Sequence, residues 1–118
     1  MTKLTVICNR FDVVKIPFPF TDRLAHKNRP AVIISSARSF NHLISHSIMA
    51  MITSTQHTSW PLDTPVNDLD SAGLPAPSII RLKLFTLDHS LIIGTLGHLS
   101  ARDTLAFNKN LTVLFSDS

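Results

Sequence analysis

The chain has 118 residues and a formal net charge of +3, and its 8 acidic residues are all Asp. This length suits one domain with a single core, which we expect to span residues 1–118. With 44% hydrophobic and 16% charged residues, the composition argues against a disordered chain, and the basic excess is compatible with a polyanionic partner. Because Asp favours caps and turns over helix interiors, we expect little helix.

Cysteine content and apolar runs exclude further classes of protein. Cys8 is the only cysteine, which excludes an intrachain disulfide and a Cys-based zinc site and predicts a small buried side chain in a reducing compartment. The apolar stretch at residues 4–8 is interrupted by Asn9 and Arg10 too soon for a signal peptide. Because no apolar run approaches membrane-spanning length, we expect a cytoplasmic protein without membrane association.

Two strands are predicted in the first third of the chain. Residues 13–16 read as a strand that Pro17 ends, because proline cannot donate to a central ladder. Residues 21–28 form a polar, basic loop. Pro30 then begins a second strand over 31–35, where the continuous apolar run predicts burial on both faces.

A third strand is predicted over 47–54. Its alternation assigns Ile48, Ala50 and Ile52 to one face and Met49, Met51 and Thr53 to the other. Residues 55–78 are rich in Pro, Asp and Ser, and only a short strand within 61–66 is weakly indicated there.

Regular structure is predicted again over 79–85, a strand with Arg81 and Lys83 on the face opposite its apolar residues. Another strand is expected over 91–96. Ser100 followed by Asp103 resembles a capping box and predicts a terminal helix with apolar positions at Leu105, Leu111, Leu114 and Phe115. The sum is a mainly antiparallel β domain of about five strands with one closing helix.

Most residues that commonly carry catalysis show no convincing pattern. The histidines are expected at the surface or in caps, since their one i,i+4 pair, His42 and His46, lacks a third ligand and the glutamate of a zinc-protease motif. The Asp positions form no cluster of the kind a two-metal nuclease needs. For Trp60, which lies beside a proline in the long loop, packing is expected rather than base stacking.

Arg29 is the best-placed cation, because Pro30 anchors it at the start of a strand. Taken alone, Arg29 reads as a solvated loop charge. The hydroxyls of Thr53 and Ser54 read as an ordinary strand end, and Arg81 with Lys83 as a solvated sheet face.

In order, however, these segments resemble the PemK/MazF family of toxins from type II toxin–antitoxin modules along nearly the whole chain. The resemblance implies a small SH3-like (CcdB/MazF-like) barrel with a C-terminal helix, acting as a homodimeric, metal-independent endoribonuclease on single-stranded RNA. It further implies inhibition by a cognate antitoxin and a reaction that needs no cofactor. The segments that carry it are Asp12-Val13-Val14, Pro17-Phe18-Pro19-Phe20-Thr21-Asp22, Arg29-Pro30-Ala31-Val32, Ala50-Met51-Ile52-Thr53-Ser54, Ala72-Gly73-Leu74-Pro75, Ile80-Arg81-Leu82 and Phe85-Thr86-Leu87-Asp88.

The resemblance also assigns roles to individual residues. It implies Arg29 and Thr53 as the catalytic pair, since they match the family's arginine before the first-loop proline and its threonine at the end of the third strand. The residues expected to contact RNA are Lys27, Asn28, Ser54, Arg81 and Lys83.

This chain departs from the family pattern at three places. Phe11 replaces the usual glycine before Asp12, and Lys83 stands where some members carry Asp. The general base is unassigned, with His26 as a candidate. Two other functions stay open: a non-enzymatic gyrase-poisoning toxin of the same fold, and a homologue that binds RNA in a salt-sensitive manner without cutting it.

Overall fold

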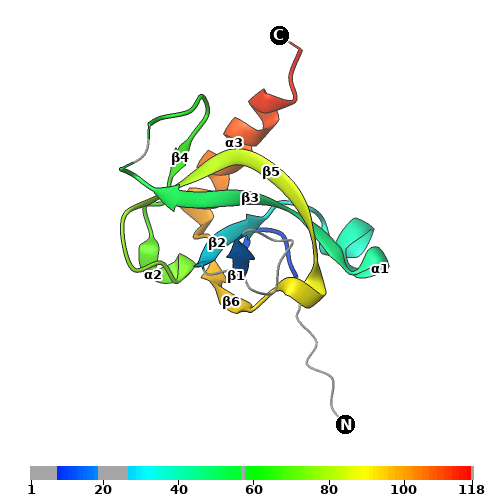
Figure 1. Cartoon of the computed structure of the whole chain (residues 1–118). Helices are drawn as coiled ribbons and strands as arrows, with labels where there is room; N and C mark the ends of the chain where they lie inside the picture. Colours follow the sequence, from blue (N-terminus) through cyan, green and yellow to red (C-terminus); the bar gives the residue numbers. More distant parts are fainter. Residues whose placement is uncertain (1–7, 19–26, 57, 118) are drawn as a thin grey trace.

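The structure is a computed structural model that describes residues 8–18, 27–56 and 58–117. Six strands form one sheet in the order β4-β5-β3-β2-β1-β6, and every neighbouring pair is antiparallel. Figure 1 shows the long β3–β5 pair arching over β2, β1 and β6, with α3 to one side. The strands are β1 (Asp12–Phe18), β2 (Lys27–Ile33), β3 (His46–Ser54), β4 (Thr64–Pro65), β5 (Ser78–Asp88) and β6 (Gly94–His98). The helical elements are η1 (Ala37–Asn41), α1 (His42–Ile44), α2 (Leu69–Ala72), η2 (His89–Leu91) and α3 (Ala101–Leu114).

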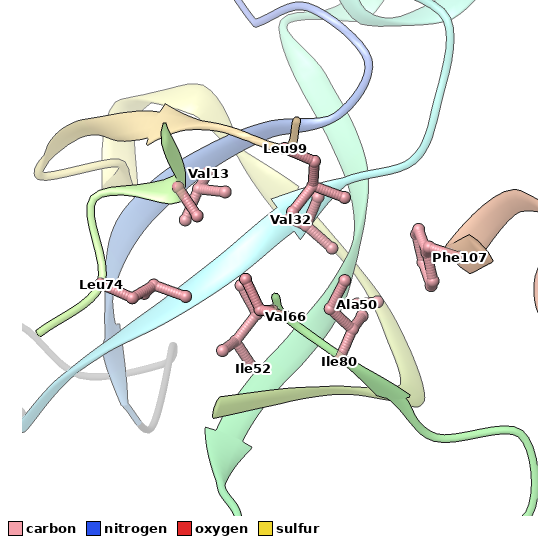
Figure 2. Packing of buried hydrophobic residues seen from close by; sticks show 10 residues of the cluster. Val13, Val32, Ala50, Ile52, Val66, Leu74, Ile80, Leu99 and Phe107 are labelled. Atoms are coloured by element: carbon pink, nitrogen blue, oxygen red, sulfur yellow. The ribbon is translucent and has the colours of Figure 1, made fainter. Parts of the chain in front are cut away.

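The curled sheet with a C-terminal helix confirms the predicted mainly β fold, a half-barrel of six strands rather than about five. Each face of the sheet carries its own apolar cluster. Figure 2 shows the first, in which Phe107 of α3 points toward Ala50 and Val32 of the sheet. The second lies on the other face and includes Ile16, Met49 and Met51. The alternation predicted for β3 is therefore confirmed.

The two strands next to the proline-containing loop are longer than predicted, and both contain proline. β1 runs through Pro17, which lies opposite Asn28 of β2. β6 pairs with β1 only over residues 12–15, so no strand of the described chain requires the missing N–H of Pro17 on that side. β2 begins at Lys27 rather than after Pro30, and its pairing with β3 begins one residue after this proline.

Residues 55–98 hold further differences from the expected elements. The weakly indicated strand is the two-residue β4, and the short helix α2 that follows was not predicted. The strand expected over 91–96 is wrong in its first half, because Asp88 accepts a hydrogen bond from the Ser90 N–H and starts the 3₁₀ turn η2. β6 occupies residues 94–98 instead.

β5 carries two extra residues relative to β3. Ala50 lies opposite Leu84, but the next residue, Met51, lies opposite Arg81. Leu82 and Lys83 are therefore extra at this irregularity, which locally bends a strand. Because two residues are added, Arg81 and Lys83 stay on the face opposite that of Leu82 and Leu84.

α3 is the predicted terminal helix, but the face expected to be apolar is wrong. Ser100 caps it by accepting the Asp103 N–H, as predicted. The Asp103 carboxylate accepts the backbone N–H groups of Asn67 and Asp68, so this buried acid tethers the β4–α2 connection. Among the four apolar positions named from sequence only Leu111 is buried; the exposed ones are Leu105, Leu114 and Phe115.

Candidate active site

Arg29 and Thr53 lie at matching positions of the neighbouring strands β2 and β3. Ala31 of β2 lies opposite Met51 of β3, and the same register continued by two residues reaches Arg29 and Thr53. Both side chains line a hollow of about 170 Å³, called here the inner hollow, whose wall includes Phe18, Arg29, Thr53, Trp60, Arg81 and Lys83. The pair predicted from the family resemblance therefore shares one concave site at the end of two strands.

Arg29 has a buried donor that finds no acceptor in the described part of the chain. Its guanidinium carbon lies 5.1 Å from the centroid of the Phe18 ring, within cation–π range. Its Nε is buried and has no hydrogen-bond partner within residues 8–18, 27–56 and 58–117. A buried N–H donor without a partner is costly, so an anion that accepts from this nitrogen would be bound favourably.

A second, outer hollow of about 390 Å³ adjoins the same pair of residues. Lys27, Asn28 and Ser54 line it together with Arg29 and Thr53. Lys27 and Asn28 are exposed at the start of β2, while the Ser54 hydroxyl accepts the Gln56 N–H at 3.1 Å. Three of the five residues expected to contact RNA therefore lie around the outer hollow.

The other two, Arg81 and Lys83, line the inner hollow, but they differ in availability. Lys83 is exposed, whereas Arg81 is only 8% exposed. Arg81 donates two hydrogen bonds to Asp63, from Nε to Oδ1 at 3.2 Å and from Nη2 to Oδ2 at 2.9 Å. Nη2 also donates to the carbonyl oxygen of Thr58 at 2.7 Å. The guanidinium of Arg81 is therefore largely engaged within the protein.

Asp63 is the site residue that sequence reasoning missed. Burial tends to raise the pKa of its carboxyl, but hydrogen bonds from Arg81 and the Trp60 N–H, with the Arg81 charge, hold that pKa below its ordinary value. The same hydrogen bond raises the pKa of Arg81. The long loop therefore supplies the carboxylate that pairs with this arginine.

Two further points concern the histidines and the possible metal ligands. His26 lies outside the described residues, so the general base stays a prediction. Across those residues no group of three or more His, Cys, Asp or Glu side chains is placed to hold a metal ion, and His42 and His46 lie on separate elements. No helix of the described ranges is both long and apolar enough to span a membrane.

Arg29 and Thr53 thus lie together at one end of the curled six-stranded sheet. Residues 9–115 match the model of the family described as PemK-like, MazF-like toxin of type II toxin-antitoxin system, and the chain belongs to this family. No match was found among curated proteins.

Solved structures show the same fold at low sequence identity. The MazE–MazF complex of Deinococcus radiodurans gives a TM-score of 0.73 at 16% identity, over 97% of this chain and 100% of that one. An endoribonuclease in complex with its cognate antitoxin from a mycobacterial species gives 0.69 at 16%, over 89% and 91%. The Mycobacterium tuberculosis toxin MazF-mt6 gives 0.66 at 20%, over 88% and 95%.

Proposed function

We propose that this protein is a toxin that cleaves single-stranded RNA without a metal ion. The observation that carries the proposal is the strand register that places Arg29 beside Thr53 in a hollow that Lys83 also lines, with an Arg29 Nε that has no partner among the described residues. The description of similar folds as endoribonucleases supports the reaction class.

RNA carries its own nucleophile, which makes this site sufficient for most of the reaction. The 2′-hydroxyl attacks the adjacent phosphorus, the bond to the 5′-oxygen breaks, and a 2′,3′-cyclic phosphate and a 5′-hydroxyl end result. Arg29 stabilises the charge that develops on the phosphorane oxygens, and Thr53 donates a hydrogen bond to one of them. A base, for which His26 is our candidate, accepts the 2′-proton, and Arg29 or water protonates the leaving oxygen.

Cleavage of a defined single-stranded RNA in excess EDTA tests this mechanism. We expect wild-type protein to cut, Arg29→Ala to reduce kcat/KM by about 10²–10³-fold and Thr53→Ala by about ten-fold. Arg38→Ala, which removes an exposed arginine of η1, is the matched control and should cut normally. Metal-dependent cutting, or cutting that survives Arg29→Ala, contradicts the proposal. Co-purification with gyrase while RNA stays intact would favour the gyrase-poisoning alternative.

We further propose that the protein acts in the cytoplasm as a homodimer and is inhibited by an antitoxin. The MazE–MazF complex supports an antitoxin partner, since its toxin shares this fold. Light scattering of the purified chain should give twice the monomer mass of 13.1 kDa. Co-expression with the product of the adjacent gene should give a stable complex that no longer cuts RNA. A complex that still cuts RNA would contradict inhibition by this antitoxin.

A further inference from the structure

The only tryptophan of the chain, Trp60, lies at the wall of the inner hollow. Its side chain is 44% exposed, in a connection between β3 and β4. Tryptophan is highly buried on average, so a large ring left exposed beside Arg29 and Lys83 is available to a ligand. The expected packing role therefore accounts for only part of the Trp60 side chain, because the rest is exposed at the hollow.

A closed turn fixes the backbone of Trp60. The Asp63 N–H donates to the Trp60 carbonyl oxygen at 3.3 Å, and the Trp60 N–H donates to Asp63 Oδ2 at 2.9 Å. Between them, Pro61 has a restricted φ and Leu62 holds φ at +64°, a conformation that usually favours glycine. A leucine in this conformation is strained by about 1 kcal/mol and persists only where surrounding contacts determine it. The turn is therefore held in one shape by its neighbours.

Arg81 supplies that constraint and also supports the ring. It binds the Asp63 carboxylate and the Thr58 carbonyl oxygen, so the loop is attached to β5 on both sides of Trp60. Its guanidinium carbon lies 5.0 Å from the centroid of the Trp60 ring. The ring is thus braced from β5 by a cation and leaves exposed surface next to Thr53 and Lys83.

We propose that Trp60 is a stacking platform for one nucleobase of a single-stranded RNA whose neighbouring phosphate is bound by Arg29 and Thr53. The inference rests on the proposed function and adds a base-binding position to it. Stacking suits any base, because each has a π-face, and the adjacent cations track the backbone. Trp60 thereby fixes where the RNA lies relative to the reacting phosphate.

Because Trp60 is the sole tryptophan, its intrinsic fluorescence reports on this position alone. The probe is a single-stranded RNA of about ten nucleotides with every 2′-hydroxyl methylated, so that it cannot be cut. We expect this RNA to quench the fluorescence saturably, while inorganic polyphosphate, which lacks bases, binds without comparable quenching. Saturable RNA binding with unchanged fluorescence overturns the platform.

Substitutions give a second readout that does not depend on fluorescence. Measured by fluorescence anisotropy of labelled RNA, Trp60→Leu should weaken binding about ten-fold, and Trp60→Phe should stay within about three-fold. Phe115→Leu is the matched control, because this ring is 72% exposed at the end of α3 and should not affect binding. Thermal unfolding of each variant checks folding. Equal affinities for wild type and Trp60→Leu overturn the inference.

The two proposals fail in different ways. RNA that is cut normally by Trp60→Leu with unchanged KM leaves the nuclease intact and removes the platform. Conversely, RNA that quenches Trp60 but is never cut supports the platform and removes the nuclease. A platform that positions the substrate should raise KM in Trp60→Leu more than it lowers kcat.

Discussion

Phe11 has a backbone conformation that a residue with a large side chain rarely adopts. Its φ is +72°, where glycine is the unstrained choice. Its N–H donates to the Ile33 carbonyl oxygen at 2.6 Å, and its carbonyl oxygen accepts the Leu99 N–H. The ring packs edge-to-face on Phe107 of α3, with centroids 6.2 Å apart. Backbone strain is therefore offset by a contact that joins the sheet to the helix.

This balance predicts an inverted order of stability for two small substitutions. Phe11→Ala removes the ring contact but keeps the strained backbone, and should destabilise the protein by about 2–3 kcal/mol. Phe11→Gly removes the same contact and relieves the strain, so it should be about 1 kcal/mol more stable than the alanine variant. Urea unfolding measures both. An alanine variant as stable as the glycine variant would show that the positive φ carries no strain.

His89 is a partly buried histidine, and we expect its titration to affect the stability of the protein. Its Nε2 lies 2.7 Å from the Oγ of buried Ser47. Burial, and then the neighbouring charges of His46 and His42, lower the pKa of His89 below 6.5, with Asp88 acting in the opposite direction. A lowered folded-state pKa means that the unfolded chain binds the proton more readily. The contribution of His89 to stability is therefore present above its pKa in the unfolded chain and is lost as the pH falls through its pKa in the folded protein.

We therefore expect the melting temperature to fall as pH is lowered from about 8 to about 5.5, with part of this fall due to His89. His89→Gln cannot take up the proton and should flatten the profile over that range. Identical slopes for wild type and His89→Gln would rule out His89 as the titrating group.

Among single residues, the sequence could predict Arg29 and Thr53 because their neighbours form recognisable segments, and the strand register then places them level. It could not predict Asp63, which reaches Arg81 across 18 positions through a loop of irregular composition. Nor could it predict the exposure of Trp60, because that depends on where this loop is tethered. Local patterns identify strand residues, whereas the wall of the inner hollow is made by non-local contacts.

Two glycines govern the contact between α2 and β6. A Cβ at Gly97 would collide with the Ser71 carbonyl oxygen, and one at Gly73 with the Leu96 carbonyl oxygen. Gly73 also ends α2 with φ of +71°. The close approach is completed by the Ser71 hydroxyl, which donates to the His98 carbonyl oxygen. These two elements meet backbone to backbone, with no room for a methyl group.

Gly97→Ala should therefore destabilise the protein by at least about 2 kcal/mol, because the obstruction is backbone that cannot rotate away. Gly94→Ala is the matched control in the same strand, since nothing lies within 4 Å of its added methyl group. That control should be neutral or slightly stabilising, within about 0.5 kcal/mol. Chemical denaturation compares the pair, and equal effects would contradict the close approach.

For the elements as a whole, periodicity predicted β3 and β5 well because each has one apolar cluster per face. It predicted α3 but not its buried face. The buried positions Asp103, Phe107 and Leu111 follow a spacing of four, and an acid at the first of them disguises that face. The turns η1 and α1 carry no strong signal: Ser36 caps η1, and their exposed residues include Leu43 and Ile44.

At the scale of the whole molecule, the two faces of the sheet carry different clusters of apolar side chains. One face binds α2 and α3 through the first apolar cluster, and the other carries the second cluster and ends in the inner hollow. Apolar side chains also remain exposed on the outer side of α3, at Leu105, Val113 and Leu114. The inner hollow is thus placed at the end of the second cluster, whereas the outer hollow borders Ile52 and Leu74 of the first.

The two extra residues of β5 limit how the length of this protein can change. Removing Leu82 alone would exchange the two faces on one side of the deletion, burying cations or exposing the core, and should abolish folding. Removing Leu82 and Lys83 together keeps every remaining side chain on its face and should leave a folded, less bent strand, as circular dichroism can show. A folded single deletion would contradict this. Across the family, then, insertions and deletions at this point of β5 should occur in twos.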